Sequence, residues 1–287
     1  MDSTLEPEEP IISPPWGEFG RVFTLAIVSL TGKFVLNWWN STKITNQSTL
    51  VKLLQQRDKG LGLITVSNHT STIDDPFVLS ALVPWSYFLT EHQHHGIRWA
   101  LCAREICYIN PFLGQFFQSG KTLAIERGKG LNQPVMRVAA QRVAQGDWLH
   151  VFPEGRVGYA GSMGPFKWGI GKIVCDSIRL GQRLPLILPF YHSGLANVLP
   201  KGSVLPRPGN EITINVGSLI DVSDLAPQCN CEGKELQQAW RDITSRIEEA
   251  MRKLEKESPP NRSQMPKVAV DGETLKEVAP KLPGKIS

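Results

Sequence analysis

The chain alternates between short apolar runs and longer segments whose apolar positions recur every three or four residues. The short runs predict buried strands, and the longer spacing predicts helices with one apolar face. The runs are "LGLITVSN" (61–68), "RWALCAR" (98–104), "TLAIER" (122–127), "WLHVF" (148–152) and "LPLILPFY" (184–191), and "EITINVG" (211–217) alternates as a strand nearer the sheet edge would. We therefore predict an α/β fold with a largely parallel central sheet flanked by helices.

Helical segments separate most of these strands. The predicted helices are "PFVLSALVPWSYF" (76–88), "NPFLGQFFQSG" (110–120), "NQPVMRVAAQRVAQG" (132–146), "KWGIGKIVCDSIRLG" (167–181) and residues 233–257. Several end near a glycine, as helices often do. The last has Leu236, Trp240, Ile243, Ile247 and Met251 at steps of three and four, so we expect an amphipathic helix packed on the core.

The N-terminal region contains a long apolar stretch. From Val22 to Trp39 the only charge is Lys33. A lysine at the bilayer centre costs about 2.5 to 3.5 kcal/mol, which disfavours a clean span, and Trp38 and Trp39 suit the headgroup level. We predict that residues 16–45 form a membrane-associating helical segment lying at the interface; the alternative is a buried helix of a soluble core.

The two ends of the chain differ in composition from the middle. Residues 1–15 are acidic and proline-rich, and residues 258–287 are rich in proline, lysine and polar residues, so both are expected to be disordered. The region between, residues 46–257, is predicted to be one domain that includes the C-terminal amphipathic helix. No basic presequence is evident at the N-terminus.

The net charge and the cysteine content argue against several classes of protein. The formal net charge of +4 over 287 residues is too small to indicate a nucleic-acid partner, but it suits local contact with anionic surfaces. The five cysteines include no C-x-x-C pair, so we expect neither a disulfide framework nor a structural zinc site. Cys229 and Cys231 are expected to lie in a loop.

The stretch "VSNHTSTIDDPF" (66–77) follows a predicted strand. Asp75 followed by Pro76 is typical of a helix start with Asp75 as N-cap, which places His69 and Asp74 in the preceding loop. There Asp74 could fold back, bind one imidazole nitrogen and leave the other free as a base. The alternative is that Asn68, Thr70, Ser71 and Asp75 only cap the helix.

Charged turns follow two other predicted strands. In "FPEGR" (152–156) Gly155 would let the backbone approach a ligand between Glu154 and Arg156, and "AIERGKG" (124–130) presents Arg127 and Lys129. Cations and exposed N–H groups at strand ends suit a phosphate. We expect the three turns to form one site.

Other chemistries have weaker support. His92, His94 and His95 lack the spacing of a ligand set, so no metal is predicted. "GQFFQSGKT" (114–122) has five residues between its glycines where a P-loop has four, and no G-x-S-x-G motif occurs. A nucleotide hydrolase that uses Lys121 is therefore a rival hypothesis only.

Taken in order, these motifs resemble a known family. His69-x-x-x-x-Asp74 and the later Phe152-Pro153-Glu154-Gly155 resemble the glycerolipid acyltransferase superfamily. "NHTSTIDDP", "GKTLAIERG" and "FKWGIGK" (166–172) are similar to one branch, the phospholipid–lysophospholipid transacylases that remodel cardiolipin. The resemblance covers roughly residues 15 to 225, and the order of the motifs is more specific than any one of them.

The resemblance implies roles for particular residues. His69 matches the catalytic base and Asp74 the acid that orients it. The matched motifs supply as substrate-binding candidates Asn68, Ser71, Arg127, Phe152, Glu154, Gly155, Arg156, Lys167 and Pro189. Arg156 stands where many members of the superfamily have threonine or serine, which bears on the acyl donor more than on the reaction.

The implied function is CoA-independent acyl transfer from a phospholipid to a lysophospholipid, with cardiolipin and monolysocardiolipin as expected substrates and no cofactor. The implied location is a mitochondrial membrane facing the intermembrane space. An acyl-CoA-dependent lysophospholipid acyltransferase is the alternative, and a non-catalytic lipid-binding protein is a further one. The formation of a homo-oligomer is left as an open question.

Overall fold

A seven-stranded sheet forms the centre of the protein in its computed structural model, which describes residues 13–84, 87, 96–158, 163–200 and 202–258. The strand order is β1-β7-β6-β2-β5-β3-β4, and only β6 and β7 pair antiparallel. The bounds are β1 Ser41–Thr45, β2 Leu63–Ser67, β3 Trp99–Ala103, β4 Thr122–Ile125, β5 Trp148–Val151, β6 Leu186–Ser193 and β7 Glu211–Val216.

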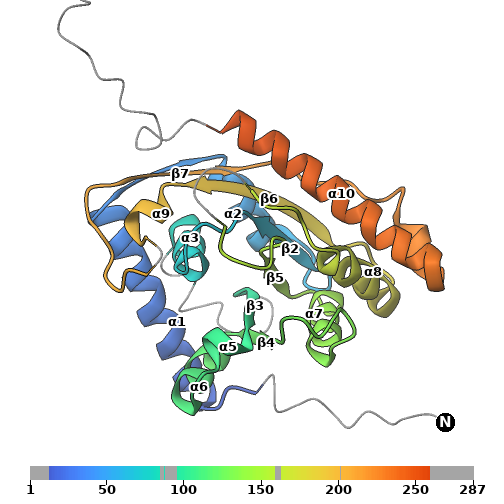
Figure 1. Ribbon diagram of the computed structural model, residues 1–287, viewed down its shortest axis with the longest axis horizontal. Coiled ribbons are helices and arrows are strands. Elements are labelled where there is room, and N and C mark those ends of the chain that lie inside the picture. Colours follow the sequence, from blue (N-terminus) through green and yellow to red (C-terminus); the bar gives the residue numbers. More distant parts are fainter. Residues whose placement is uncertain (1–12, 85–86, 88–95, 159–162, 201, 259–287) are drawn as a thin grey trace, which may run out of the picture.

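Helices cover both faces of this sheet (Figure 1). Neighbouring strand residues point to opposite faces, so Ile64 and Leu149 join one core cluster while Leu63 and Trp148 join the other. The first cluster is completed by α7 (Pro134–Ala144), α8 (Gly169–Gly181) and α10 (Gly233–Glu257), and the second by α1 (Gly17–Lys33), α2 (Gln47–Gln56) and α3 (Asp74–Leu82). The predicted α/β architecture is confirmed.

Further short helices occur between β3 and β4, after β6 and before α10. They are α5 (Arg104–Cys107), α6 (Pro111–Ser119), α9 (Leu195–Val198) and the 3₁₀ helix η3 (Ala226–Asn230). Asn110 caps α6, since its side chain accepts a hydrogen bond from the Leu113 N–H at 2.9 Å. Gly114 lies inside α6, and Lys121 is fully buried. This geometry is not that of a P-loop.

The N-terminal apolar helix is only partly what the sequence predicts. Helix α1 continues into a π-helix, η2 (Phe34–Trp38), but Ser41–Thr45 form the edge strand β1, so the prediction of helix up to residue 45 was wrong. The β-branched residues of "STKIT" pair with β7 there. One face of α1 packs on α3, and the Lys33 ammonium donates to the Val83 carbonyl at 2.7 Å.

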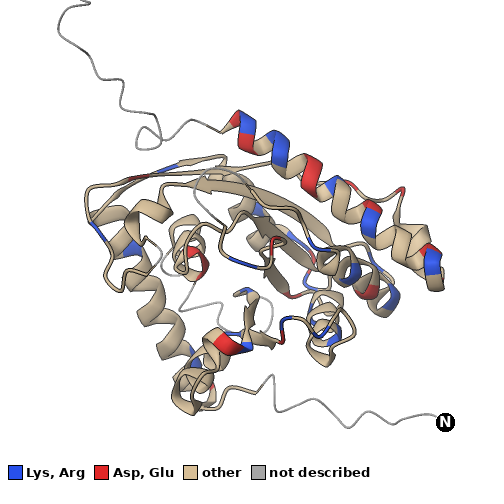
Figure 2. Cartoon of the chain, viewed as in Figure 1, with Lys and Arg blue, Asp and Glu red and all other residues tan. Residues whose placement is uncertain are grey.

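The opposite face of this helix is apolar and exposed. Its exposed large side chains follow steps of three and four residues: Phe19, Phe23, Ile27, Leu30, Phe34 and Trp38. The helix from Gly17 to Trp38 is long and apolar enough to cross a membrane, yet 44% of its most apolar window is buried. Figure 2 shows α1 almost free of charge, whereas charges follow one another along α10.

The expectation that the cysteines form no disulfides is overturned. The cysteines do form disulfides, Cys102 with Cys107 and Cys175 with Cys229, and Cys231 is free. Cys175 lies in α8 and Cys229 in η3, two elements that pack together although 54 residues separate the cysteines. Spacing rules cannot detect such a pair, because tertiary packing makes it.

Asp75 is not the N-cap of α3. The helix is assigned from Asp74, Asp75 has an extended conformation with φ −105° and ψ 120°, and its peptide bond to Pro76 is cis. The Asp75 carboxylate instead pairs with Arg98 at 2.6 Å. The expected disorder of the chain ends and the cluster His92, His94 and His95 concern residues outside those described, apart from Ser13–Pro15 and Ser258.

Candidate active site

Strand pairing brings the predicted motifs together. Strands β2 and β5 are parallel, with Val66 opposite Val151. Continuing that register three residues beyond this pair places His69 beside Glu154. Since β4 and β3 point the same way, the turn after β4, which carries Arg127, reaches the same edge of the sheet. The carboxyl ends of parallel strands are where such folds bind ligands.

His69 and Asp74 form a hydrogen-bonded pair. The Asp74 carboxylate accepts from the His69 ring at Nδ1, with Nδ1–Oδ2 3.0 Å, and from the Ser71 N–H at 2.9 Å. It also accepts from the Thr70 N–H, so the loop closes around a side chain that is fully buried. A carboxylate only accepts hydrogen bonds, so Nδ1 carries a proton, and in the neutral imidazole Nε2 is the nitrogen that can accept one.

The His69 ring faces a cavity of about 780 Å³. Phe152 stacks against it, with ring centroids 4.0 Å apart, and the ring is 18% exposed. Helix α1 and α3 form part of the wall, and most lining side chains are apolar, among them Leu25, Val28, Ile73, Phe77, Phe116 and Phe117. A proton-accepting nitrogen at the wall of an apolar cavity suits acyl chemistry.

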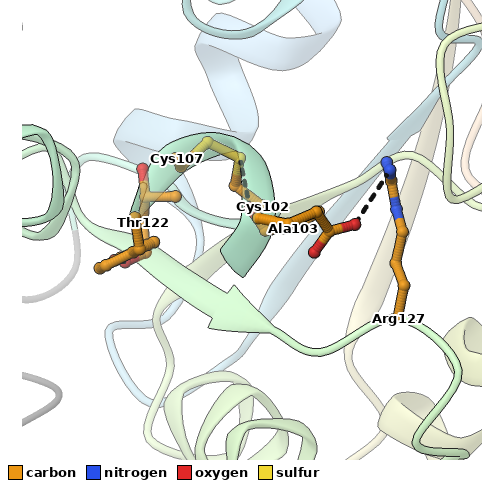
Figure 3. The surroundings of a disulfide bond; sticks show 7 residues. Cys102, Ala103, Cys107, Thr122 and Arg127 are labelled. Atoms are coloured by element: carbon orange, nitrogen blue, oxygen red, sulfur yellow. Dashed lines mark hydrogen bonds and ion pairs between the residues drawn. A yellow bond between two sulfur atoms is a disulfide. The ribbon is translucent and has the colours of Figure 1, made fainter. Parts of the chain in front are cut away.

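Three further candidates line the same cavity: Arg127, Gly155 and Lys167. Gly155 has φ +67°, a left-handed conformation that favours glycine, and the Lys167 ammonium lies 2.9 Å from where a Cβ would be. Within the described residues Lys167 makes no ion pair and its side chain is exposed. Arg127 is bound to Glu105, with Nη1–Oε1 3.3 Å (Figure 3).

Asn68, Ser71 and Glu154 are buried, and their polar atoms bind the protein itself. The Glu154 carboxylate accepts from the His69 N–H at 2.9 Å and the Gly164 N–H at 2.8 Å. The Ser71 hydroxyl donates to the Leu199 carbonyl at 3.0 Å. In the structure these side chains hold the turn that carries His69; their binding to substrate stays a prediction.

Arg156 and Pro189 are not brought into the cavity by the described part of the chain. Arg156 is exposed, and Pro189 is buried within β6 beside Gly217. Their substrate contacts also stay predictions. No group of three or more metal-ligating side chains occurs among the residues that the structure describes.

The sequence reasoning missed four residues around the dyad. Arg98 lines the cavity and pairs with Asp75. The sequence signal that could have pointed to it is a charged residue at the start of the apolar run 98–104. His150 and His192 flank the dyad on β5 and β6, where burial lowers the pKa of each imidazole and keeps it neutral. Cys102, bonded to Cys107, forms part of the cavity wall (Figure 3).

A hydrogen-bonded His–Asp pair thus lies at the wall of a largely apolar cavity, an arrangement that could activate a hydroxyl, and the comparisons with known proteins identify the family. The acyltransferase family model matches residues 43–193, and the chain belongs to this family. Among relatives, a Tafazzin of Drosophila melanogaster is 34% identical over 82% of this chain and 61% of its own length. A Taffazin of Dictyostelium discoideum is 33% identical over 81% of this chain and 85% of its own.

Two other matches place the family more broadly. An N-acylphosphatidylethanolamine synthase of Arabidopsis thaliana is 35% identical over 71% of this chain and 72% of its own. The crystal structure of the 1-acyl-sn-glycerophosphate acyltransferase PlsC from Thermotoga maritima has the same fold, with TM-score 0.51, 18% identity, and 82% of this chain and 80% of that chain covered. The chain thus spans less than two thirds of the Drosophila relative but most of the other three proteins.

Proposed function

We propose that the protein transfers a fatty acyl group from a phospholipid to the hydroxyl of a lysophospholipid at a membrane surface, without CoA, and that it remodels cardiolipin. The observation that carries this proposal is the His69–Asp74 pair at the wall of an apolar cavity. The similarity to tafazzins supports the choice of phospholipid chemistry and of mitochondrial membranes, with the site facing the intermembrane space.

The reaction needs one group that both accepts and returns a proton. His69 Nε2 takes the proton of the lysophospholipid hydroxyl as its oxygen attacks the ester carbonyl of the donor. When the tetrahedral intermediate collapses, the C–O bond to the donor glycerol breaks, and the imidazolium gives its proton to the leaving oxygen. Asp74 holds the ring and stabilises its positive charge. The donor leaves as a lysophospholipid, so atoms and charge balance.

Two lining cations are the candidates for binding lipid phosphates. Lys167 is exposed beside Gly155, and Arg127 reaches the cavity from the turn after β4. Around Arg127 the charges nearly cancel, because Arg104, Arg127 and Lys129 pair with Glu105 and Glu126. This turn thus carries one net positive charge and Lys167 adds a second, which suits the singly charged phosphodiesters of a donor and an acceptor lipid better than the several phosphates of acyl-CoA.

The exposed stripe on α1 and η2 is the proposed membrane contact. Thr24, Leu25, Val28 and Ser29 of the same helix line the cavity, so lipid at the outer face would be next to the site. Trp16 at the start of the helix contacts Phe112 of α6, whose exposed ring extends the apolar face. Since the inner face of α1 is packed against protein, the helix is proposed to lie at headgroup depth.

The decisive experiment measures transfer of a radiolabelled acyl group from phosphatidylcholine to monolysocardiolipin by the full chain, with and without added acyl-CoA. We expect transfer without CoA, and a loss of about 10²- to 10⁴-fold in His69→Ala. Activity only with acyl-CoA would show that acyl-CoA, not a phospholipid, is the donor. Equal activity in His69→Ala and the wild type would refute the mechanism. Phosphatidylethanolamine is included as acceptor, because acylation of its amine would favour the chemistry named for the Arabidopsis relative.

Vesicle co-sedimentation tests the membrane contact separately. Phe23→Glu and Leu30→Glu should weaken binding to vesicles of phosphatidylcholine and cardiolipin, since each places a charge on the exposed stripe. Leu180→Glu is the matched control, because Leu180 of α8 is similarly exposed, at 46%, on a different helix. Equal binding by all three variants and the wild type would exclude α1 as the contact.

A further inference from the structure

A buried histidine from β6 is bound to the residue that precedes His69. The Asn68 side-chain amide donates to the His192 carbonyl at 2.8 Å, and the His192 N–H donates to Asn68 Oδ1 at 3.0 Å. The ring of His192 adds a third bond, from Nε2–H to the Asn68 carbonyl at 2.9 Å. These bonds join residues 124 positions apart in the sequence.

The parallel pairing of β2 with β6 makes this contact possible. Ser67 lies opposite Phe190, so the register brings Asn68 to the level of the last residues of β6. Both partners are buried, with Asn68 2% and His192 0% exposed. A carbonyl held in this way cannot rotate freely, and the peptide plane that it fixes leads directly into the Cα of His69.

The same ring nitrogen lies close to the other member of the dyad. His192 Nε2 is 3.6 Å from Asp74 Oδ2, the oxygen that binds His69. Because Nε2 carries the proton given to Asn68, Nδ1 has none, and within the described residues Nδ1 has no hydrogen-bond partner. A leucine would fill the space without leaving a buried nitrogen unsatisfied, so packing alone does not account for a histidine here.

We propose that His192 is a positioning residue: through Nε2–H it holds the Asn68 carbonyl and faces Asp74, and thereby fixes the His69 ring with Nδ1–H on Asp74 and Nε2 toward the cavity. The inference rests on the proposed function in that His69 is the base. It adds a residue that is not among those lining the cavity and that acts through its neighbours.

Two substitutions separate positioning from packing. His192→Gln places an amide N–H near the position of Nε2, whereas His192→Leu keeps a similar side-chain size without a donor. Thr244→Val is the control for loss of a buried hydrogen bond elsewhere, since the Thr244 hydroxyl donates to Trp240 in its own helix, α10. Thermal unfolding of all three variants establishes that they fold.

We expect kcat of acyl transfer to fall about 10- to 100-fold in His192→Leu, by analogy with the loss of outer-shell partners that orient metal-bound histidines. KM should stay near the wild-type value, and His192→Gln should recover most of kcat. In ¹⁵N NMR spectra, His69 should be the Nδ1–H tautomer in the wild type and in His192→Gln, and a mixture in His192→Leu. An equal loss of kcat in both variants would overturn the proposal.

The NMR measurement keeps the two proposals apart. A tautomer change in His192→Leu with no acyl transfer in the wild type would uphold the positioning and refute the proposed function. Unchanged tautomer in His192→Leu would refute the positioning whatever the activity, and a loss of kcat equal to that of Thr244→Val would assign His192 to stability alone.

Discussion

Buried ionisable side chains gather at two places in this protein, and only one of them opens on the cavity. After β2, Asp74 and Glu154 hold His69 so that its ring lines the cavity. At the start of β3, Arg21, Lys121 and Arg142 surround the ring of Trp99, close to Asp147, and none of these side chains is among those lining the cavity.

The difference between these two clusters shows which property distinguishes the candidate active site from other buried charged groups. Burial lowers the pKa of Lys121 from 10.5 to about 7, the value wanted in a general base. Yet its ammonium donates to the Ile97 carbonyl at 3.2 Å and faces an indole, and its side chain is not among those that line the cavity. Hence the lowered pKa of Lys121 reports its burial, and access to the cavity is what favours His69 over Lys121 as the proposed base.

The largest effect should come from Asp74→Asn. The asparagine oxygen can still accept from Ser71 and His69 at the position of Oδ2, but the amide is neutral, so the imidazolium formed during transfer would lose its stabilising charge. We expect acyl transfer to fall about 10²- to 10⁴-fold. In the double variant Asp74→Asn/His69→Ala, the loss of acyl-transfer activity should be no greater than in His69→Ala alone, because the two residues act as one unit. Additive losses in the double variant would contradict the dyad.

Arg98→Met should cost more stability than any single change around Trp99. The Arg98–Asp75 pair is nearly buried, at 8% and 10% side-chain exposure, and its removal leaves Asp75 charged beside the apolar cavity. Breaking a buried pair costs about 3 to 5 kcal/mol in the free energy of unfolding. Urea denaturation measures it, and adding Asp75→Asn should recover part of the loss. No recovery would mean that Arg98 acts through the Gly120 carbonyl instead.

The disulfide between α8 and η3 should affect stability but not chemistry. Cys175→Ala with Cys229→Ala removes a bridge that is remote from the dyad and should lower the free energy of unfolding by about 2 to 4 kcal/mol. Acyl transfer at a temperature where the variant is folded should match the wild type. A fall in kcat would show that α8, which contributes Ile170 and Ile173 to the cavity, shifts when the bridge is lost.

The smallest effect on activity is expected for Lys121→Met, which should leave acyl transfer unchanged. Between about pH 7 and pH 10.5 the unfolded lysine is protonated and the folded one is not, so raising the pH favours the folded wild type. The stability of the wild type relative to Lys121→Met should therefore be lowest below pH 7 and rise through this window. If Lys121→Met abolished acyl transfer, the cluster around Trp99 would take part in the reaction, contrary to our comparison of the two regions.

Much of the fold could be predicted, because its main elements have local signals. Five buried runs and one alternating run became strands, and 233–257 became α10 with the predicted residues facing the core. The edge strand β1 was missed since "STKIT" follows an apolar helix directly and its pairing partner, β7, is about 170 residues away. Local periodicity contains no information about such a partner.

The sequence by itself determined that His69 and Asp74 share a turn after a buried strand, that charged turns follow two other strands, and that the chain has an apolar N-terminal helix. Tertiary structure alone decided which polar residues face the cavity and which hold the turn: Asn68 and Glu154 point into protein, Lys167 and Arg127 toward the cavity, and Asp75 to Arg98. The reason is physical, since the orientation of a side chain depends on strand register and on buried partners from distant segments, which local sequence does not specify.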